Sequence, residues 1–401
     1  MEFGDFILEH EADDLGRLAL ARDRFLPAMP EFDLALTTLE VRRKLRLKVP
    51  EWYAVPGLRY PLRLSGEQCS SSETARYKAQ VAAGLAGTGR GRLADLTGGL
   101  GVDTWAFAQV FDRVLYNEMR PELAAAAQAN FAALGLENVT VQCRELVPGG
   151  VASVLGDFRP TVLYLDPARR SSDGHKVFRL EDCQPAVLAL LPELFAACPR
   201  VLLKLSPMAD ISLVCRQLGS VRAVHIVAAE GECKELLLVL ERGYAGEPVR
   251  YVYESGTVME IPGPAPESVA PLCCSTMNLA GSLLFEPGKG LLKAAAFDLP
   301  CGYGLEKLGR HTHLYVGASV PEALLPFGKC FEVLEAVPFS NRALKDLGRR
   351  YPQAEVTARN LPLTSDQLRA RLGCRSGGSV HLFGVHIDAL QGNYLLVSRP
   401  L

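Results

Sequence analysis

Residues 93–103 read Leu-Ala-Asp-Leu-Thr-Gly-Gly-Leu-Gly-Val-Asp. An apolar segment that ends in Asp95 is typical of a buried strand, and the pattern of residues 103–108 is typical of a helix. Three glycines lie between these elements, Gly98, Gly99 and Gly101. Glycine lets the backbone approach a ligand closely, and a helix start offers N–H groups without intrahelical partners. The stretch therefore predicts a strand, a glycine-rich turn and a helix that bind a nucleotide-like ligand.

The spacing of the glycines distinguishes this turn from two other nucleotide-binding motifs. A dinucleotide turn has the pattern G-x-G-x-x-G, and a P-loop has Lys-Ser/Thr after its last glycine. The pattern Asp95-x-Thr-Gly-Gly-x-Gly has neither spacing. It resembles motif I of the class I S-adenosylmethionine-dependent methyltransferases, whose cofactor carries a cationic sulfonium and an ammonium. An acidic strand end suits that cofactor better than it suits a pyrophosphate.

Two further acidic residues follow where such a fold needs them. Residues 113–118 predict a short apolar strand that ends in Glu118, where a carboxylate can hold a ribose diol. Residues 138–145 predict a third strand, and Glu145 stands where many methyltransferases place an acid near the adenine. An alanine-rich helix between the two strands completes a β-α-β passage.

The carboxyl edge of the predicted sheet gathers further polar residues. Residues 161–165 predict a continuous apolar strand at the centre of a parallel sheet, and Asp166-Pro-Ala-Arg-Arg follows it. This places a carboxylate and two guanidiniums at the edge where open α/β folds bind ligands. Lys204 stands inside the apolar strand 201–205, where a lysine needs a reason. The alternative is that its ammonium reaches solvent from the strand end.

The bulk composition predicts a globular protein of two or three domains. The chain has 401 residues with 48% hydrophobic content, and its longest apolar run, residues 186–198, is interrupted by Pro192 and Glu193. We therefore expect no signal peptide, no membrane partner and a cytoplasmic location. Eleven cysteines without a C-x-x-C pair are typical of reduced thiols. His311 and His313 are expected to be a plain surface pair, so no obligate metal is expected.

Charge is unevenly distributed along the chain. The net charge is −2, but residues 280–401 carry 14 Lys+Arg against 10 Asp+Glu, a balance of +4 that leaves −6 for the rest. This asymmetry is compatible with a nucleic-acid-binding C-terminal part. The densest basic run is residues 42–48, Arg-Arg-Lys-Leu-Arg-Leu-Lys. It is either the solvated face of a helix, which is favoured, or a strip that contacts phosphates.

The chain resembles the bacterial class I methyltransferases that carry a ferredoxin-like segment followed by a THUMP-like domain. The matching motifs are Ser71-Ser-Glu-Thr-Ala-Arg-Tyr-Lys78, Asp95-x-Thr-Gly-Gly-x-Gly-x-Asp103, Asp166-Pro-Ala-Arg-Arg170, Lys204-Leu-Ser-Pro207, Lys234-Glu-Leu-Leu237 and Arg359-Asn-Leu-Pro-Leu363. The resemblance implies S-adenosylmethionine as cofactor and, through the THUMP-like domain, a structured RNA such as tRNA or rRNA as substrate. The oligomeric state stays open.

The expected fold is α/β, with a Rossmann-like, seven-stranded class I methyltransferase sheet, an N-terminal helical cap and a C-terminal α+β THUMP-like module. Its parts are a helical cap (1–85), the methyltransferase domain (86–243), a linker (244–282), a ferredoxin-like segment (283–325) and a THUMP-like domain (326–401). The residues expected to hold the cofactor are Asp95, Thr97, Gly98, Gly99, Gly101, Asp103, Glu118, Met119, Glu145, Asp166 and Pro167.

Three methyl-transfer chemistries can be compared with the residues at the sheet edge. The first is methylation of uridine carbon 5 in RNA, because Asp166-Pro-Ala-Arg resembles the D-P-P-R element of those enzymes. They need a cysteine just after the fifth strand, where this chain has Ser206, and Cys215 is too far along. The second is amino methylation, where an (N/D)-P-P-(Y/W) element holds an NH2 group. Arg169 stands in place of its aromatic residue.

The third chemistry is ribose 2′-O-methylation of RNA, which uses a Lys-Asp-Lys-Glu tetrad to deprotonate a hydroxyl. Lys78, Asp166, Lys204 and Glu235 follow that order along the chain. A desolvated lysine crowded by another lysine can lose its proton and serve as a base. Each residue alone is better explained as a surface or ion-pairing group, so the order of the four carries the hypothesis. Together with Arg169 they are the catalytic candidates.

Two other functions stay open. The chain could be an RNA-binding protein whose methyltransferase fold is catalytically silent, since fold does not fix function. It could also methylate a small molecule or a protein, which the basic C-terminal part disfavours.

Overall fold

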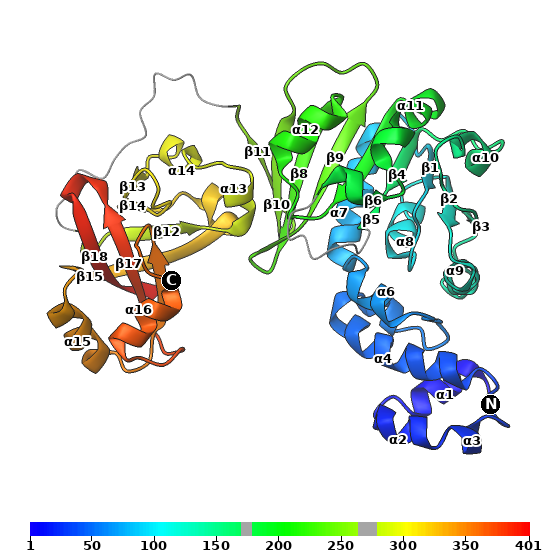
Figure 1. Cartoon of the computed structure of the whole chain (residues 1–401), viewed down its shortest axis with the longest axis horizontal. Helices are drawn as coiled ribbons and strands as arrows, with labels where there is room; N and C mark the ends of the chain where they lie inside the picture. The colour runs from blue at the N-terminus through cyan, green and yellow to red at the C-terminus, as the bar shows by residue number, and fades with distance from the viewer. Residues whose placement is uncertain (170–178, 264–278) are drawn as a thin grey trace. The chain divides into compact units, whose positions relative to one another are not determined.

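The computed structural model describes residues 1–169, 179–263 and 279–401, apart from the side chain of Arg169. Within these residues the chain forms two compact units (Figure 1). The first comprises residues 1–225 and 235–248, and the second comprises residues 226–234 and 249–401. None of the helices described is both long enough and apolar enough to cross a membrane.

The first unit is built around a mostly parallel sheet. Its strands are β1 (Arg92–Asp95), β2 (Arg113–Glu118), β3 (Val139–Cys143), β4 (Val162–Leu165), β7 (Arg200–Leu205), β8 (Val221–Ala229) and β9 (Glu232–Glu241). β1 pairs in parallel with β2 and β4, β2 with β3, and β4 with β7, whereas β9 runs antiparallel to β7. The order β8-β9-β7-β4-β1-β2-β3 confirms the expected Rossmann-like methyltransferase sheet.

Two strands extend the sheet beyond the seven that were expected. β10 (Val249–Glu254) and β11 (Thr257–Ile261) bring its strand count to nine, and they belong to the second unit, as do residues 226–234 of β8 and β9. Ser255 and Gly256 join them with φ angles of 46° and 88°, the left-handed pair that a tight hairpin turn requires. Residues 244–282, expected as a linker, therefore contain a hairpin, and the Ser-Gly turn between two β-prone runs is the signal for it.

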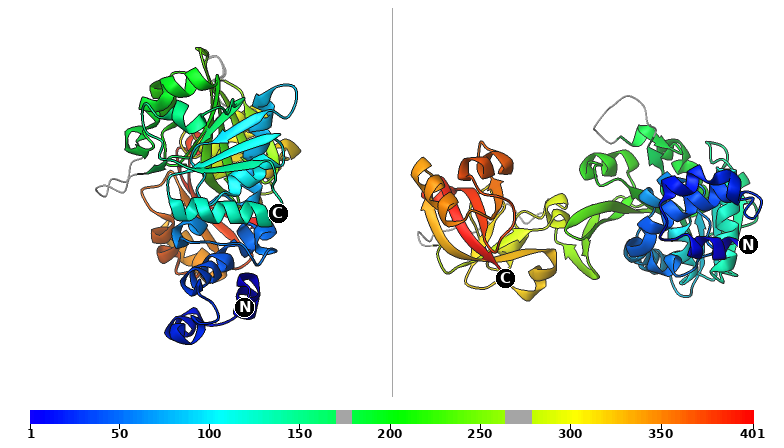
Figure 2. Two further views of the ribbon diagram at one scale, coloured as in Figure 1. Left: turned by 90° about the vertical axis from the view of Figure 1, so that its right-hand side faces the viewer. Right: turned by 90° about the horizontal axis from the view of Figure 1, so that it is seen from below.

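Helices cover both faces of this sheet (Figure 2). They are α7 (Ser72–Ala86), α8 (Val102–Ala108), α9 (Pro121–Ala133), α10 (Val151–Leu155), α11 (Val187–Ala197) and α12 (Ile211–Leu218). α7 begins at a serine cap, because the Ser71 side chain accepts a hydrogen bond from the Thr74 backbone N–H. The helix contacts both α8 and β4, so its residues reach the interior of the unit.

The N-terminal part of the first unit is helical, as expected. Its helices are α1 (Phe3–Glu9), α2 (Leu15–Leu20), α3 (Arg22–Phe25), α4 (Phe32–Lys48), α5 (Pro50–Tyr53) and α6 (Arg63–Gln68). The basic run 42–48 ends α4, and most of its cations contact this same part of the chain. Arg42 is buried against Glu11, and Lys44 lies 2.6 Å from Glu67. Intramolecular bonds therefore occupy the run that was weighed as a phosphate-contacting strip.

The second unit is an α+β module around a separate sheet. Its strands are β12 (Leu283–Pro287), β13 (Glu306–Lys307), β14 (Tyr315–Gly317), β15 (Gly328–Pro338), β16 (Glu355–Arg359), β17 (His381–Ile387) and β18 (Gly392–Pro400). The order is β13-β14-β12-β15-β18-β17-β16. Since β12 pairs with both β14 and β15, the segments 283–325 and 326–401 contribute to one sheet.

In the described part of the second unit, four α-helices accompany the sheet: α13 (Lys289–Lys293), α14 (Leu299–Gly302), α15 (Asn341–Arg350) and α16 (Ser365–Leu372). Thr364 caps α16 in a capping box with Gln367. Leu344 and Leu347 of α15 and Leu368 of α16 are buried in the same core as strand residues of this sheet.

Candidate active site

The glycine-rich turn follows β1 as expected, but its glycines serve different purposes. A Cβ at position 98 would lie 2.1 Å from the ring of Tyr116, and one at position 101 would lie 2.7 Å from the ring of Phe131. Gly98 and Gly101 are therefore required by the packing of the chain on itself. Gly99 differs, because its φ is +55° and the nearest atom to an added Cβ is a backbone oxygen at 3.9 Å. Of the three, Gly99 leaves room for a ligand.

Asp95, at the end of β1, is directed into the protein. It is only 1% exposed, and its carboxylate accepts hydrogen bonds from the Thr97 N–H at 3.1 Å and the Thr104 hydroxyl at 2.6 Å. Burial raises the pKa of this carboxyl to about 7, against an ordinary value of 3.8. The Asp95 side chain therefore joins the turn to α8, and its expected role toward the cofactor stays a prediction.

Glu118, at the end of β2, contacts the glycine-rich turn at Gly99. Its Oε2 accepts from the Gly99 N–H and its Oε1 accepts from the Arg120 N–H, both at 2.9 Å. A carboxylate oxygen has a second lone pair, so both oxygens can still accept from a diol. Met119 beside it is 46% exposed, and Glu145 is an exposed residue beyond the end of β3.

Asp166, at the end of β4, is held close to the turn. The Thr97 hydroxyl accepts a 2.6 Å hydrogen bond from the Asp166 backbone N–H, so the β1 turn and the end of β4 are fixed to each other. The Asp166 side chain is 37% exposed, and Pro167 after it is half-buried. Arg169 has its backbone in β5 (Ala168–Arg169), and its side chain lies outside the described part of the structure.

The four tetrad candidates meet in one cluster. Lys204 Nζ donates to Asp166 Oδ2 at 2.5 Å and lies 3.8 Å from Glu235 Oε2. The other oxygen of Glu235 accepts from Lys78 Nζ at 2.6 Å. Lys78 comes from α7, Asp166 follows β4, Lys204 is on β7 and Glu235 is on β9, so four elements each supply one member.

Asp103, which was expected to hold the cofactor, contacts this cluster. Its Oδ1 lies 3.2 Å from Lys78 Nζ, and its Oδ2 accepts a 2.7 Å hydrogen bond from the Tyr164 hydroxyl. Lys78 is fully buried and also donates to the Ser70 hydroxyl at 2.7 Å. Sequence reasoning missed Ser70 and Tyr164. A tyrosine inside the apolar run of β4 was the available signal, since a buried hydroxyl needs a partner.

Three acidic side chains and two lysines lie together in the cluster, and their mutual attraction shifts the pKa values of Lys204 and Asp103. Burial by itself lowers the pKa of Lys204, but Asp166, Glu235 and Asp103 together raise it above its usual range. Burial raises the pKa of Asp103, but Lys78 and Lys204 outweigh this effect and lower it. The three carboxylates therefore favour the charged form of Lys204 over the neutral form that a base requires.

The donor set at the sheet edge fits S-adenosylmethionine. Glu118 offers a carboxylate to a diol, Gly99 leaves space beside it, and Asp166 adds an exposed negative charge that suits a sulfonium or an ammonium. In the described ranges, no group of three His, Cys, Asp or Glu residues could hold a metal ion. His313 stacks on the ring of Phe297.

The fold and the site define a class I methyltransferase, and comparisons with known proteins agree. A candidate methyltransferase from Porphyromonas gingivalis W83, known from its crystal structure, is 30% identical with a TM-score of 0.85, over 99% of this chain and 97% of that one. An uncharacterized S-adenosylmethionine-dependent methyltransferase of Mycobacterium tuberculosis is 28% identical over 315 residues, 77% of this chain and 79% of the relative.

Two family models match the C-terminal part of the chain. A ferredoxin-like domain model matches residues 283–323, and a THUMP domain-like model matches residues 328–399. The chain therefore belongs to the S-adenosylmethionine-dependent methyltransferases that carry a ferredoxin-like segment and a THUMP-like domain.

Proposed function

We propose that this methyltransferase acts on RNA, with a structured molecule such as tRNA or rRNA as its substrate. The observation that carries the proposal is the presence, in one chain, of the Asp166–Lys204 pair at the sheet edge and a THUMP domain-like segment at residues 328–399. The balance of +4 in residues 280–401 supports it, because a positive surface attracts a polyanion.

The cofactor side of the site is assigned to Glu118, the Gly99 backbone and the exposed carboxylate of Asp166. When bound there, S-adenosylmethionine supplies an electrophilic methyl group on its sulfonium. Glu118 would hold the ribose diol, and its bonds to the N–H groups of Gly99 and Arg120 would keep the carboxylate in one orientation. Asp95 would act indirectly, by fixing the turn through Thr97 and Thr104.

The acceptor that fits best is an amino group of a base. Asp166 is the most exposed acid of the cluster, and Lys204 fixes one of its oxygens at 2.5 Å. An oxygen held in this way can accept a hydrogen bond from an N–H and orient the nitrogen lone pair. An amino nitrogen needs no prior loss of a proton, which agrees with a Lys204 that stays protonated.

Ribose 2′-O-methylation is the second candidate, and the contacts among Lys78, Glu235, Lys204 and Asp166 favour it. It requires Lys204 to lose its proton, against the pull of three carboxylates that raise its pKa. Binding of a positively charged group beside Asp166 would oppose that pull, because Asp166 is one of the three.

Mass spectrometry of RNA nucleosides from a deletion strain and its parent tests the function. We expect one methylated nucleoside to be missing from the deletion strain and to return when the gene is restored. A base-methylated nucleoside supports the amino acceptor. A 2′-O-methyl nucleoside, which resists alkaline hydrolysis on its 3′ side, supports the tetrad. Unchanged RNA would contradict the proposal and favour a small-molecule or protein substrate, or a catalytically silent fold that only binds RNA.

A further inference from the structure

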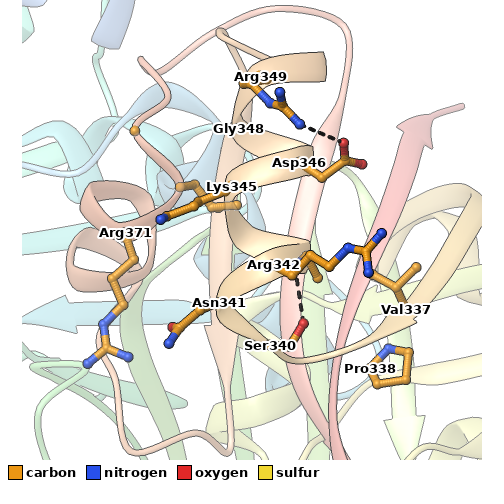
Figure 3. A pocket seen from close by; sticks show the side chains of 13 residues that line it. Val337, Pro338, Ser340, Asn341, Arg342, Lys345, Asp346, Gly348, Arg349 and Arg371 are labelled. Carbon is orange, nitrogen blue, oxygen red and sulfur yellow. Dashed lines mark hydrogen bonds and ion pairs between the residues drawn. The ribbon is translucent and has the colours of Figure 1, made fainter.

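A hollow of about 1250 Å³ lies on the THUMP-like part of the second unit, beside α15 and the end of α16 (Figure 3). Four cationic side chains line it, Arg342, Lys345, Arg349 and Arg371. Asp346 is the one acidic residue of the lining. The hollow is therefore strongly positive, although the chain as a whole has a net charge of −2.

The pattern of α15 explains how three of these cations come together. Leu344 and Leu347 are buried in the core of the second unit, which fixes one face of the helix. Arg342, Lys345 and Arg349 are exposed, and they are spaced three and then four residues apart. Residues at this spacing share one side of a helix. The helix therefore presents a basic stripe on the side away from its core.

Gly348 brings the fourth cation to the stripe. A Cβ at position 348 would lie 1.8 Å from the backbone oxygen of Leu372, so α15 approaches the end of α16 more closely than any other residue would allow. Arg371, the neighbour of Leu372, therefore lines the same hollow as α15. From this one face of α15, the Lys345 side chain extends to the left in Figure 3, toward the side where Arg371 lies, and the Arg342 side chain extends to the right, toward Val337 and Pro338.

The cations of the hollow form few ion pairs within the described residues, whereas Arg42 and Lys44 of α4 are paired with glutamates. Among the residues that the structure describes, Arg342, Lys345 and Arg371 form no salt bridge, and Arg349 has one 3.4 Å contact with Asp346 in which it stays 81% exposed. An exposed contact of that kind contributes little. Adjacent Arg350 contrasts with them, since it lies 2.6 Å from Glu335. The stripe is thus open to an external anion.

We propose that this hollow binds the phosphate backbone of the RNA substrate. The identity of the ligand rests on the proposed function, whereas its polyanionic chemistry rests on the four cations. A helix that docks on an anionic membrane inserts large apolar side chains, but the leucines of α15 are buried in its own unit. Ser340 and Asn341 add polar groups at the helix start. Such contacts position RNA without reading its sequence.

The test compares two triple variants of the full-length protein with the same loss of charge. The first carries Arg342→Gln, Lys345→Gln and Arg371→Gln in the hollow. The control carries Lys289→Gln, Lys329→Gln and Arg399→Gln, which are exposed cations of the second unit outside the lining. Binding of bulk tRNA and of single-stranded poly(U) is measured over a range of salt concentrations, and thermal unfolding verifies that both variants fold.

We expect the hollow variant to bind tRNA at least about tenfold more weakly near 0.1 M salt, and the control to change by less than about threefold. The slope of log K against log salt is negative and should become shallower by about 2 in the hollow variant, because each lost phosphate contact removes about 0.7–0.9 from its magnitude. Equal weakening of both variants, or wild-type affinity in the hollow variant, overturns the assignment of this surface.

A second arm separates this inference from the proposed function. If the wild-type protein modifies RNA and the hollow variant binds RNA normally, the assignment of RNA binding to the hollow is wrong and the proposed function is supported. If the wild-type protein leaves RNA unmodified but binds it through the hollow, the proposed function is wrong and the assignment of RNA binding to the hollow is supported. Binding through the stripe to phosphatidylserine vesicles, with no binding to either RNA, would overturn the choice of partner.

Discussion

Lys204 and Asp166 are joined by a 2.5 Å hydrogen bond between the ends of two neighbouring strands, β7 and β4. The bond fixes one oxygen of the most exposed acid in a cluster of three carboxylates and two lysines. A charge inside an apolar strand is costly unless it is paired, and here the pairing also orients the acid at the sheet edge.

Lys204→Ala should lower kcat by at least about 100-fold, because Asp166 loses the hydrogen bond that orients its carboxylate. Calorimetry should show a nearly unchanged affinity for S-adenosylmethionine. Lys234→Ala, at an exposed lysine of β9, is the control and should retain activity. Equal losses in the two variants would rule out a specific role for Lys204.

Lys204→Arg separates the two acceptor chemistries. A guanidinium can still donate to Asp166 but cannot give up its proton. With an amino acceptor the variant should keep measurable turnover, whereas ribose methylation through a lysine base should be abolished. The measurement is single-turnover methylation of RNA at saturating cofactor.

Glu118→Ala should weaken binding of S-adenosylmethionine by about tenfold or more, the loss of roughly one to two charged hydrogen bonds. Calorimetry measures this affinity. Glu145→Ala is the matched comparison, because that acid is exposed beyond β3. An unchanged affinity in Glu118→Ala would remove this residue from the site, and a loss confined to Glu145→Ala would reverse the two roles.

The buried Asp95 should make the protein less stable as pH rises. Its folded pKa, raised chiefly by burial to about 7, exceeds the ordinary value of 3.8. Its contribution is thus fully present below about pH 3.8 and is lost as pH rises through 7, since the unfolded state releases the proton first. In the Asp95→Asn variant, the free energy of unfolding in urea should fall less steeply between about pH 3.8 and pH 7 than it does in the wild type. The exposed Asp112→Asn should follow the wild type.

Gly101→Ala should destabilise the first unit by at least about 2 kcal/mol, from left-handed strain and overpacking against Phe131. Its φ is +93° and the added Cβ would lie 2.7 Å from that ring. Gly135→Ala is the control, because φ is +70° there and no atom lies within 4 Å of the Cβ. It should cost only about 1 kcal/mol from strain. Equal costs in urea unfolding would contradict the packing role of Gly101.

The sequence by itself determined the parts of this protein that depend on neighbours along the chain. The strand, turn and helix around Gly99, the capped start of α7 and the extent of α15 follow from periodicity, caps and turn residues. The approach of Asp166 and Lys204 also follows from the sequence, because the carboxyl ends of neighbouring parallel strands meet at one edge of a sheet. The order of Lys78 and Glu235 along the chain is visible as well, but their contacts depend on a helix and an antiparallel strand. The Ser-Gly hairpin after β10 was equally local and was missed.

Only the tertiary structure decided what each of these residues contacts. Gly98 is required because Tyr116, a residue of another strand, occupies the space of its side chain, and Asp103 joins the lysine cluster because Lys78 and Tyr164 reach it. The protonation of Lys204 depends on a sum over carboxylates from separate elements. Burial and charge are sums over neighbours in space, so no local pattern of residues can specify them.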